Sequence, residues 1–366
     1  MAVAPASRAL ATVYELFEWS PAAARMRHNR LMERGWERAF PFVELSAGQM
    51  ELLVGRAMPG ARVVAAQPLT SGLRNTNYRI ELAGGARLLL RLYVADPEAC
   101  AREAGLLAAM TGRVAVPRLL YSDARAKPPF ALLEWLEGQA LDEVLAGTDE
   151  PTARELAAVC GAALAAIHRT RFLAPGFLGP QMRVVAPMPA WAPTVLETLA
   201  GRVVERLGPE LAGRVRQAVE SNAGAVEPVW SEAVLVHADY KPWNLLVRRA
   251  ASTEADVDAE REAEREPESA AAVPWQVAGI LDWEFACAGC KLIDFATFLR
   301  GEAELPAGFG DAFASAYLAA GGSLPPGWRR LTRLVDLLNL MQLLAWADDR
   351  AADGLCRLVQ KSIESV

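Results

Sequence analysis

The stretch that decides the fold is residues 234–246, which read VLVHADYKPWNLL. An apolar run opens it and leads into a polar turn that holds Asp239, and Asn244 follows five positions later. Further along the chain, a second apolar run ends in Asp282. Two strands that end in aspartate and a turn that ends in asparagine can bring three oxygen-bearing side chains around one hard cation. We therefore predict that Asn244 and Asp282 bind Mg²⁺ against nucleotide phosphates, and that Asp239 accepts the proton of a hydroxyl group.

Two motifs in these stretches resemble those of kinases. The residues from His237 to Asn244 resemble the catalytic loop H-x-D-x-K-x-x-N, and Asp282-Trp-Glu stands where protein kinases carry D-F-G. D-W-E in this place, with no A-P-E after it, is similar to the aminoglycoside phosphotransferase and choline kinase group. The resemblance runs from about residue 60 to the end of the chain.

The resemblance implies a fold class and an activity. The fold is α+β and two-lobed, protein-kinase-like, with a small, mostly antiparallel β lobe and a larger, mostly helical lobe. The activity is Mg²⁺-assisted, in-line transfer of the γ-phosphoryl group of ATP or GTP to a hydroxyl group of a small molecule. The implied cofactors are ATP or GTP and Mg²⁺, and the partner is a small-molecule hydroxyl acceptor whose identity stays open.

By the same resemblance, Asp239 and Lys241 are the catalytic residues. A carboxylate with a pKa near ~4 is a weak base toward an alcohol, so Asp239 is expected mainly to align the hydroxyl group and to take its proton late. Lys241 would neutralise charge on the transferred phosphoryl group. The alternatives are a polar turn that caps itself for Asp239 and Asn244, and a solvated side chain for Lys241.

Composition limits the class of protein. The chain has 366 residues, 52% of them hydrophobic, which is enough for a substantial core. Of the net charge of −6, all is carried by residues 251–270, with eight acids against two arginines, so the body is neutral and a nucleic-acid partner is not expected. Five scattered cysteines do not form a disulfide framework, and Cys287-x-x-Cys290 lacks the ligands that would complete a zinc site. With no signal peptide and no apolar run of ~18 residues, we predict a cytoplasmic protein that does not enter membranes.

The chain divides into three predicted parts: an N-terminal helical extension with a basic stretch (1–45), a nucleotide-binding lobe (46–135) and a helical lobe with the catalytic loop (136–366). A capping box at Ser46 and Gln49 predicts a first helix of the second part. The predicted strands of that part are 63–69, 77–82, 87–94, 114–121 and 130–135, with a helix from Asp96 to about Thr111. The predicted helices of the third part are 141–145, 152–169, 194–206, 209–222, 292–300, 311–320 and 328–349.

An acidic insert separates the two predicted metal ligands. Residues 251–273 are low in complexity and poor in aromatic side chains. Asn244 and Asp282 are 38 positions apart, and removing the 24 residues 251–274 leaves 14, the length of a compact hairpin. The two ligands can therefore be close if the insert bulges away from the fold, where a regulatory role is less expected than a tolerated surface excursion.

The predicted nucleotide site is less sharply defined. Arg91 lies in the middle of an apolar strand and needs an acidic partner, for which Glu103 on the next helix is the candidate. Arginine in place of the kinase lysine still suits phosphate, and a purely structural ion pair is the alternative.

Two further segments are expected to contact the nucleotide. In the loop after the first strand, Ser71, Gly72 and Asn75 would present hydroxyl and N–H groups to phosphates, although a plain hairpin turn fits equally well. The connector between the lobes, Glu134 to Leu136, would offer its backbone to the adenine edge.

Three other polar residues are expected to be architectural. His237 should fix the catalytic loop by bonding to backbone, His168 closes an apolar helix, and Asp294 should cap a helix or support the loop. The acids of the late helices, Asp336, Asp348 and Asp349, could attract a cationic acceptor, but solvated helix faces are the favoured reading.

The alternative functions are a catalytically silent kinase-like protein that binds a nucleotide or metabolite, and a protein kinase. The first is disfavoured because none of the three metal-site groups is lost, and the second because A-P-E is missing.

Overall fold

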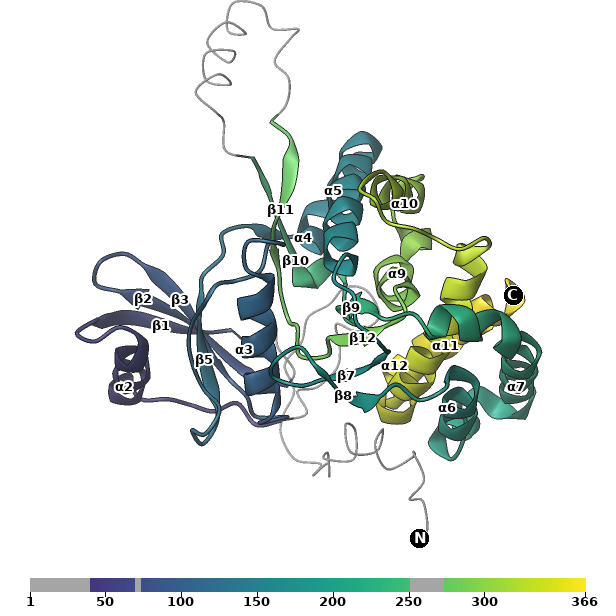
Figure 1. The fold of residues 1–366 in the computed structure, drawn as a ribbon, viewed down its shortest axis with the longest axis horizontal. Coiled ribbons are helices and arrows are strands. Elements are labelled where there is room, and N and C mark those ends of the chain that lie inside the picture. Colours follow the sequence, from purple (N-terminus) through teal and green to yellow (C-terminus); the bar gives the residue numbers. More distant parts are fainter. Residues whose placement is uncertain (1–39, 70–73, 251–272) are drawn as a thin grey trace, which may run out of the picture.

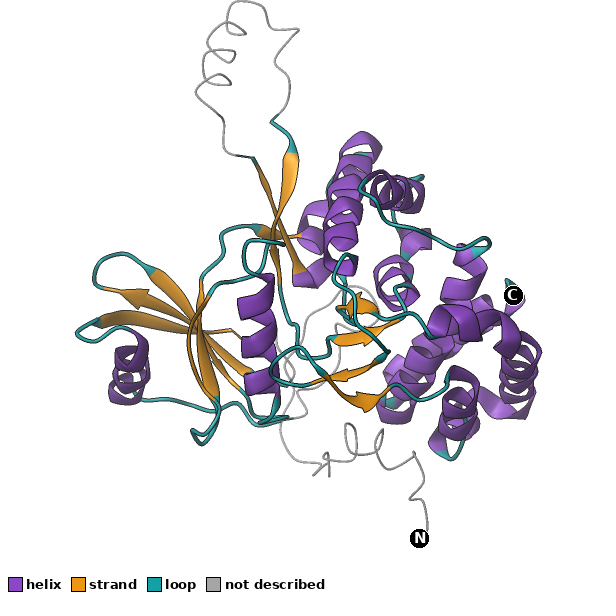
Figure 2. Ribbon diagram, viewed as in Figure 1, coloured by secondary structure: helices purple, strands orange, loops and turns teal. Residues whose placement is uncertain are grey.

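The computed structural model describes residues 40–69, 74–250 and 273–366. Residues 1–39 of the predicted extension, Ser71 and Gly72, and residues 251–272 of the acidic insert lie outside the described residues. Two lobes make up the described part, one built mainly of strands and the other mainly of helices (Figures 1 and 2). The expected two-lobed α+β architecture is confirmed.

Five antiparallel strands form the sheet of the smaller lobe. In spatial order they are β1 (Val63–Leu69), β2 (Thr76–Leu82), β3 (Arg87–Leu92), β5 (Phe130–Glu134) and β4 (Leu119–Asp123). The fourth predicted strand was placed too early, since β4 begins at Leu119 and not at Val114. Pro117 has no backbone N–H to give to a ladder, and the chain joins the sheet only beyond it.

Two helices cover opposite faces of this sheet. α2 (Ala47–Ala57) begins with the predicted capping box, in which Ser46 and Gln49 bond to each other's backbone. α3 (Ala99–Met110) lies on the other face. Adjacent residues of β5 show the alternation, because Leu132 shares a core with α2 whereas Leu133 shares one with α3.

The larger lobe is mainly helical. Its helices are α4 (Leu141–Leu145), α5 (Glu150–His168), α6 (Trp191–Thr198), α7 (Arg202–Trp230), α9 (Leu292–Leu299), α10 (Phe309–Ala319), α11 (Trp328–Trp346) and α12 (Asp349–Glu364), with short 3₁₀ turns η1 (Pro242–Asn244) and η2 (Glu302–Glu304).

The break predicted between residues 206 and 209 is confirmed, because α7 has a kink at Gly208, whose φ is 72°. The other boundaries predicted between 194 and 222 were wrong, because α6 ends at Thr198 and α7 begins at Arg202 and runs to Trp230. Gly201, with a positive φ, separates the two helices. The long helix predicted over 328–349 likewise ends at Trp346, and Asp348 caps a new helix.

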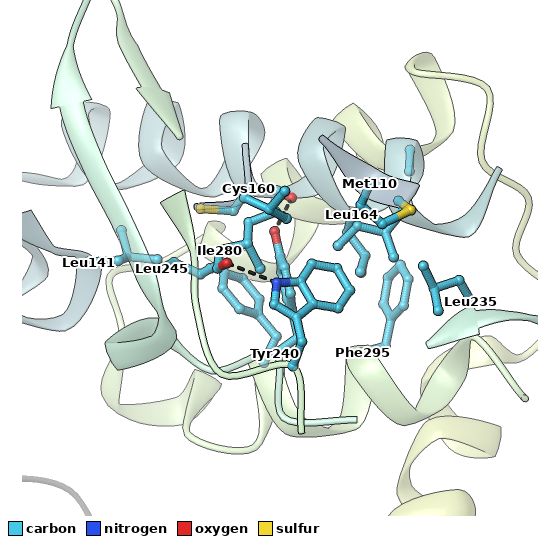
Figure 3. Packing of buried hydrophobic residues seen from close by; sticks show 14 of the residues in the cluster. Met110, Leu141, Cys160, Leu164, Leu235, Tyr240, Leu245, Ile280 and Phe295 are labelled. Carbon is cyan, nitrogen blue, oxygen red and sulfur yellow. Dashed lines mark hydrogen bonds between the residues drawn. The ribbon is translucent and has the colours of Figure 1, made fainter. Parts of the chain in front are cut away.

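Close packing holds the catalytic part of the larger lobe. α5 approaches α10 so closely that a Cβ on Gly161 would lie 2.1 Å from the carbonyl oxygen of Phe313. In the same core, the hydroxyl group of buried Tyr240 donates to the carbonyl oxygen of Cys160 at 2.9 Å (Figure 3). The residue directly after Asp239 is thereby anchored on α5.

Short strands position the catalytic segments, and those that precede Asp239 and Asp282 were expected from the sequence. β11 (Trp275–Ile280), β10 (Leu245–Arg249) and β6 (Gln139–Ala140) form one small sheet that lies between the two lobes in Figure 1. β8 (Val184–Pro187), β7 (Gly176–Leu178), β12 (Cys287–Gly289) and β9 (Val234–Val236) form another. β10 and β11 are antiparallel and pair Leu245 with Ile280, which is the hairpin expected across the insert.

Among the described residues, no helix has the length and apolar character needed to span a bilayer.

Candidate active site

One buried carboxylate, that of Asp294, accepts hydrogen bonds from the backbone of the catalytic turn after β9. Asp294, on the first turn of α9, accepts the backbone N–H of His237 at 2.9 Å and that of Ala238 at 2.7 Å. Its Oδ2 also lies 3.0 Å from Nε2 of His168. These bonds hold Ala238 at a φ of 64°, a left-handed conformation that is unfavourable without such support. Asp294 is thus a loop support, as expected, and His168 is architectural.

His237 links the catalytic turn to the segment before Asp282. Its Nδ1 accepts the backbone N–H of Asp239 at 3.2 Å, and its Nε2 donates to the carbonyl oxygen of Leu281 at 2.9 Å. The two bonds fix the ring in one tautomer and leave both nitrogens occupied. The expectation that His237 bonds to backbone is confirmed.

Asn244 brings the predicted metal ligands together. Its Nδ2 donates to Oδ2 of Asp239 at 2.8 Å, and its backbone oxygen accepts the N–H of Leu281 at 2.8 Å. Since the amide NH₂ is spent on Asp239, the oxygen Oδ1 is the atom that could face a cation. Asn244 therefore contacts Asp239 and the residue next to Asp282 at the same time. The bond within the turn is the one that the self-capping alternative expects, so both readings account for it.

Lys241 lies against the catalytic carboxylate. Its Nζ is 2.7 Å from Oδ1 of Asp239, and its side chain is only 10% exposed. The alternative of a solvated lysine is wrong, because the side chain is largely buried and pairs with Asp239. With Lys241 on one oxygen and Asn244 on the other, Asp239 is held in a single orientation.

Arg91 is the centre of a buried charged cluster that joins the lobes. Its guanidinium lies 2.6 Å from Oδ1 of Asp282, 3.3 Å from Oε2 of Glu103 and 3.9 Å from Oε2 of Glu284. Burial alone would lower the pKa of Arg91, but the neighbouring carboxylates outweigh it and raise that pKa well above its ordinary value. The predicted partner, Glu103, is present, and Asp282 is a second one that the sequence did not indicate.

Glu103 connects three elements around Arg91. Besides the arginine, it accepts the hydroxyl group of Tyr93 at 2.6 Å and the backbone N–H of Trp283 at 3.3 Å. The pKa of Tyr93 is raised well above its usual range, first by burial and then by the negative charge of Glu103. The helix after β3 is thereby tied to the D-W-E segment.

The pKa values of the two carboxylates in the D-W-E segment are shifted in opposite directions. Burial raises the pKa of Asp282, but its ion pair and hydrogen bond with Arg91 outweigh this and lower it below the ordinary value. The pKa of Glu284 is instead raised to about 7, by burial and then by the charge of Asp282. Asp282 stays an anion suited to a cation, whereas Glu284 is about half protonated near neutral pH.

Glu284 is a site residue that sequence reasoning did not single out. Arg74 lies 3.0 Å from its Oε1, and Nδ2 of Asn75 donates to its Oε2 at 3.0 Å. The signal was present, because an acid stands where D-F-G has glycine. Asn75, expected to present groups to phosphates, instead directs its side chain to Glu284 and to the backbone N–H of Val94.

The connector residues lie beside the hairpin that carries Asn244. The backbone N–H of Glu134 donates to the carbonyl oxygen of Arg118 at 2.9 Å, so Glu134 could reach an adenine edge only through its own carbonyl group. Leu136 packs so closely on Gly279 that a Cβ there would lie 2.6 Å from its Cδ1. The structure thus brings Asp239, Lys241, Asn244, Asp282, Arg91 and Glu103 into one linked region and leaves Ser71 and Gly72 undescribed.

The donor set suits Mg²⁺. Among the described residues, no group of three or more histidine, cysteine, aspartate or glutamate side chains could hold a metal ion. An amide oxygen of Asn244 with the anionic carboxylate of Asp282 is the mixed, hard-oxygen environment in which Mg²⁺ keeps several waters and binds phosphates.

The acids of the late helices do not form an acceptor site. Asp336 is buried and makes a forked ion pair with Arg300, at 2.6 and 3.0 Å. The favoured interpretation of a solvated helix face was therefore wrong for Asp336, which faces the interior from α11. Asp348 caps α12, and exposed Asp349 lies 3.5 Å from Arg206.

Comparisons with known proteins agree with this architecture. The model of the phosphotransferase enzyme family matches residues 65–254 and 273–334. No curated protein matches the sequence.

Solved structures share the fold at low sequence identity. The GDP and kanamycin complex of APH(2")-IIia has a TM-score of 0.59 and 17% identity, over 86% of this chain and 97% of that one. Aminoglycoside phosphotransferase APH(4)-Ia has a TM-score of 0.57 and 15% identity, over 87% and 99%. Macrolide 2'-phosphotransferase MphH from Brachybacterium faecium has a TM-score of 0.55 and 17% identity, over 86% and 97%. The protein-kinase-like fold is confirmed.

Proposed function

The chain belongs to the phosphotransferase enzyme family, and from this premise we propose that it transfers the γ-phosphoryl group of ATP or GTP to a hydroxyl group of a small molecule. The observation that carries the proposal is the fixed orientation of Asp239, in which Lys241 pairs with one carboxylate oxygen and Asn244 donates a hydrogen bond to the other. Phosphoryl transfer asks a protein mainly for positioning and for charge near the transferred group, and this arrangement supplies both.

In the proposed step, the acceptor oxygen forms a bond to the γ-phosphorus while the bond from that phosphorus to the β,γ-bridging oxygen breaks. Asp239 orients the hydroxyl group and takes its proton late, and the nucleoside diphosphate leaves with the bridging oxygen. Lys241, at 2.7 Å from Asp239, lies where it can stabilise negative charge on the transferred group.

On the nucleotide side, Asn244 and Asp282 would hold Mg²⁺, which when bound neutralises charge on the phosphate oxygens. Arg91 already contacts Asp282, so only its remaining N–H groups would be available to phosphate. A nucleotide cofactor is supported by similar structures that carry GDP or AMP-PNP in their printed descriptions.

For the acceptor, the similar structures with kanamycin or hygromycin B support a hydroxylated small molecule. The acids of the late helices give no support to a cationic acceptor, because the carboxylate of Asp336 is already paired with Arg300. A protein kinase is disfavoured by both the missing A-P-E segment and the matched family.

The test is nucleotide turnover measured against a panel of hydroxylated sugars, amino alcohols and antibiotics, with Mg²⁺ present. Asp239→Ala should abolish transfer while nucleotide binding, followed by calorimetry, persists. Turnover that survives in this variant would remove Asp239 from its role.

A silent binding protein is the second candidate, and one contact favours it. The guanidinium group of Arg91 lies 2.6 Å from Oδ1 of Asp282, so the charge of one predicted metal ligand is already balanced by a cation. Stabilisation by Mg-ATP without turnover on any acceptor would support this candidate over the first.

A further inference from the structure

A cavity lies on the far side of the catalytic turn. It has a volume of about 130 Å³ and is lined by residues from the end of α5, the start of β9, the start of α9 and the turn after α10. Val234, at the first position of β9, forms part of its wall, whereas Asp239 follows the last position of that strand. The cavity and the candidate active site therefore lie at opposite ends of β9.

The size of the cavity limits its occupant. Sites for drug-sized ligands and cofactors have volumes of roughly 300–1,000 Å³, and a single ordered water needs roughly 10–15 Å³. At about 130 Å³ the cavity is too small for a nucleotide and large enough for a small ion with some water.

The charges around the cavity favour an anion. Arg169 and Arg171 line it from the exposed side, and buried Lys291 lines it from within. Nζ of Lys291 lies 3.0 Å from Glu232 and donates to the hydroxyl group and the carbonyl oxygen of Ser323, at 3.0 and 3.2 Å, so Lys291 contributes charge rather than a free N–H group. Arg169 donates one N–H group to the carbonyl oxygen of Ala320 at 2.8 Å. The donors for an anion are therefore the remaining guanidinium N–H groups of Arg169 and Arg171, and guanidinium groups make forked hydrogen bonds to tetrahedral oxyanions.

The cavity wall is connected to the catalytic turn by hydrogen bonds. Tyr317 lines the cavity, and its hydroxyl group lies 3.0 Å from Nδ1 of His168. Nε2 of His168 lies 3.0 Å from Asp294, which accepts the backbone N–H groups of His237 and Ala238. Asp294 is fully buried behind His168, so its charge is satisfied within this chain of bonds.

We propose that this cavity binds a small oxyanion of the phosphate class, and that its occupancy is transmitted to the catalytic turn through Tyr317, His168 and Asp294. A bound anion would cross-link Arg169, Arg171 and the turn after α10. Tyr317 lies in the last turn of α10, next to that turn of the chain. An anion that orders the turn would therefore also order the hydroxyl group of Tyr317, which contacts His168.

The first experiment measures binding by calorimetric titration of the full chain with inorganic phosphate. Arg169→Gln and Arg171→Gln should each weaken binding by about tenfold, since each removes one charge-assisted contact. Arg357→Gln, at an exposed position of α12, removes the same charge elsewhere and should leave the affinity unchanged. Glycerol phosphate, titrated in parallel, distinguishes a free ion from a phosphate monoester, and either supports the oxyanion class.

The second experiment follows hydrogen exchange at the amides of His237 and Ala238. Saturating phosphate should slow their exchange several-fold in the wild type and much less in Arg171→Gln.

Absence of phosphate binding, or equal affinity in Arg169→Gln, Arg171→Gln and Arg357→Gln, would overturn the site. Unchanged amide exchange at saturation would overturn the transmission. Neither readout requires turnover, so the result is independent of the proposed function.

Discussion

The catalytic turn and the charged cluster around Arg91 are held together by different means. In the turn, Asp239 is bonded to Asn244, only five positions away, and to Lys241. In the cluster, Arg91 and Asp282 are 191 positions apart, and Asn75 and Glu284 are 209 apart. The turn rests largely on backbone hydrogen bonds, whereas the cluster rests on buried ion pairs that join strands of one lobe to the D-W-E segment.

This difference predicts that changes in the catalytic turn affect mainly the reaction, whereas changes in the cluster affect mainly stability. A substitution in the turn should remove a catalytic group while its backbone bonds to Asp294 and His237 persist. A substitution in the cluster leaves partner charges buried and unpaired, which costs more than the ion pair itself contributed. The experiments below test that contrast, beginning with the largest expected effect.

The turn is tested by Asp239→Asn. The amide keeps the size of the side chain but cannot take a proton, so we expect kcat to fall by about 10³-fold, or ~4 kcal/mol of barrier. The free energy of unfolding should fall by less than for a change in the cluster, because only Lys241 loses its partner charge. Turnover and urea denaturation measure the two quantities. Asp349→Asn, at an exposed position, is the matched control and should leave both unchanged. A large loss of stability in Asp239→Asn would contradict the division into chemistry and architecture.

The cluster is tested by Arg91→Met. Methionine fills the space but leaves Asp282, Glu103 and Glu284 without their cation, so we expect unfolding to become easier by about 3 kcal/mol. Arg87→Met lies on the same strand, where the arginine is paired at the surface with Glu81 and Glu137, and should cost under about 1 kcal/mol. Denaturation midpoints compare the two variants, and equal losses would show that the cluster does not stabilise the lobes.

The support beneath the turn is tested by Asp294→Asn. One of the two backbone N–H groups, of His237 or Ala238, would lose its acceptor or face an NH₂ group, at a cost of about 2 kcal/mol. We expect a lower kcat together with faster amide exchange at these two positions. Asp353→Asn, at an exposed position of α12, is the control. Unchanged exchange in Asp294→Asn would show that the turn keeps its shape without this carboxylate.

The last test concerns pH. The pKa of Glu284 is raised from 4.5 to about 7 in the folded protein, chiefly by burial and then by Asp282. Between these pH values the folded state holds a proton that the unfolded state has released, so this group makes stability fall as pH rises through that window.

Glu284→Gln removes this titration. Without added metal or nucleotide, the stability of the variant relative to the wild type should increase by about 2 kcal/mol between pH 5 and pH 7 and stay level above pH 8. Urea denaturation at several pH values measures it. Parallel pH profiles for the two proteins would mean that Glu284 does not titrate in this range.

Much of the site could be predicted because its signals are local. The order of Asp239, Asn244 and Asp282 along the chain, and the short distance left after removing the insert, were enough to anticipate the β10–β11 hairpin. The capping box at Ser46 and the need of Arg91 for an acidic partner followed from the chemistry of single residues.

Other features depend on contacts that no local pattern reports. Asp336 stands among charged and apolar residues of a long helix, and only the position of Arg300 decides that it faces inward. The inward turn of Asn75 is likewise set by a neighbour distant in sequence, Glu284.

The amino-acid sequence by itself determined the family, the two-lobed fold class and the identity of the groups around the catalytic turn, because motif spacing and periodicity are properties of neighbouring residues. Only the tertiary structure decided that Arg91 pairs with Asp282, that Glu284 is drawn into the cluster, and that Tyr317 and His168 connect a basic cavity to the turn. The physical reason is that a buried charge or hydrogen-bonding group must find a partner, and which partner it finds depends on how distant segments pack.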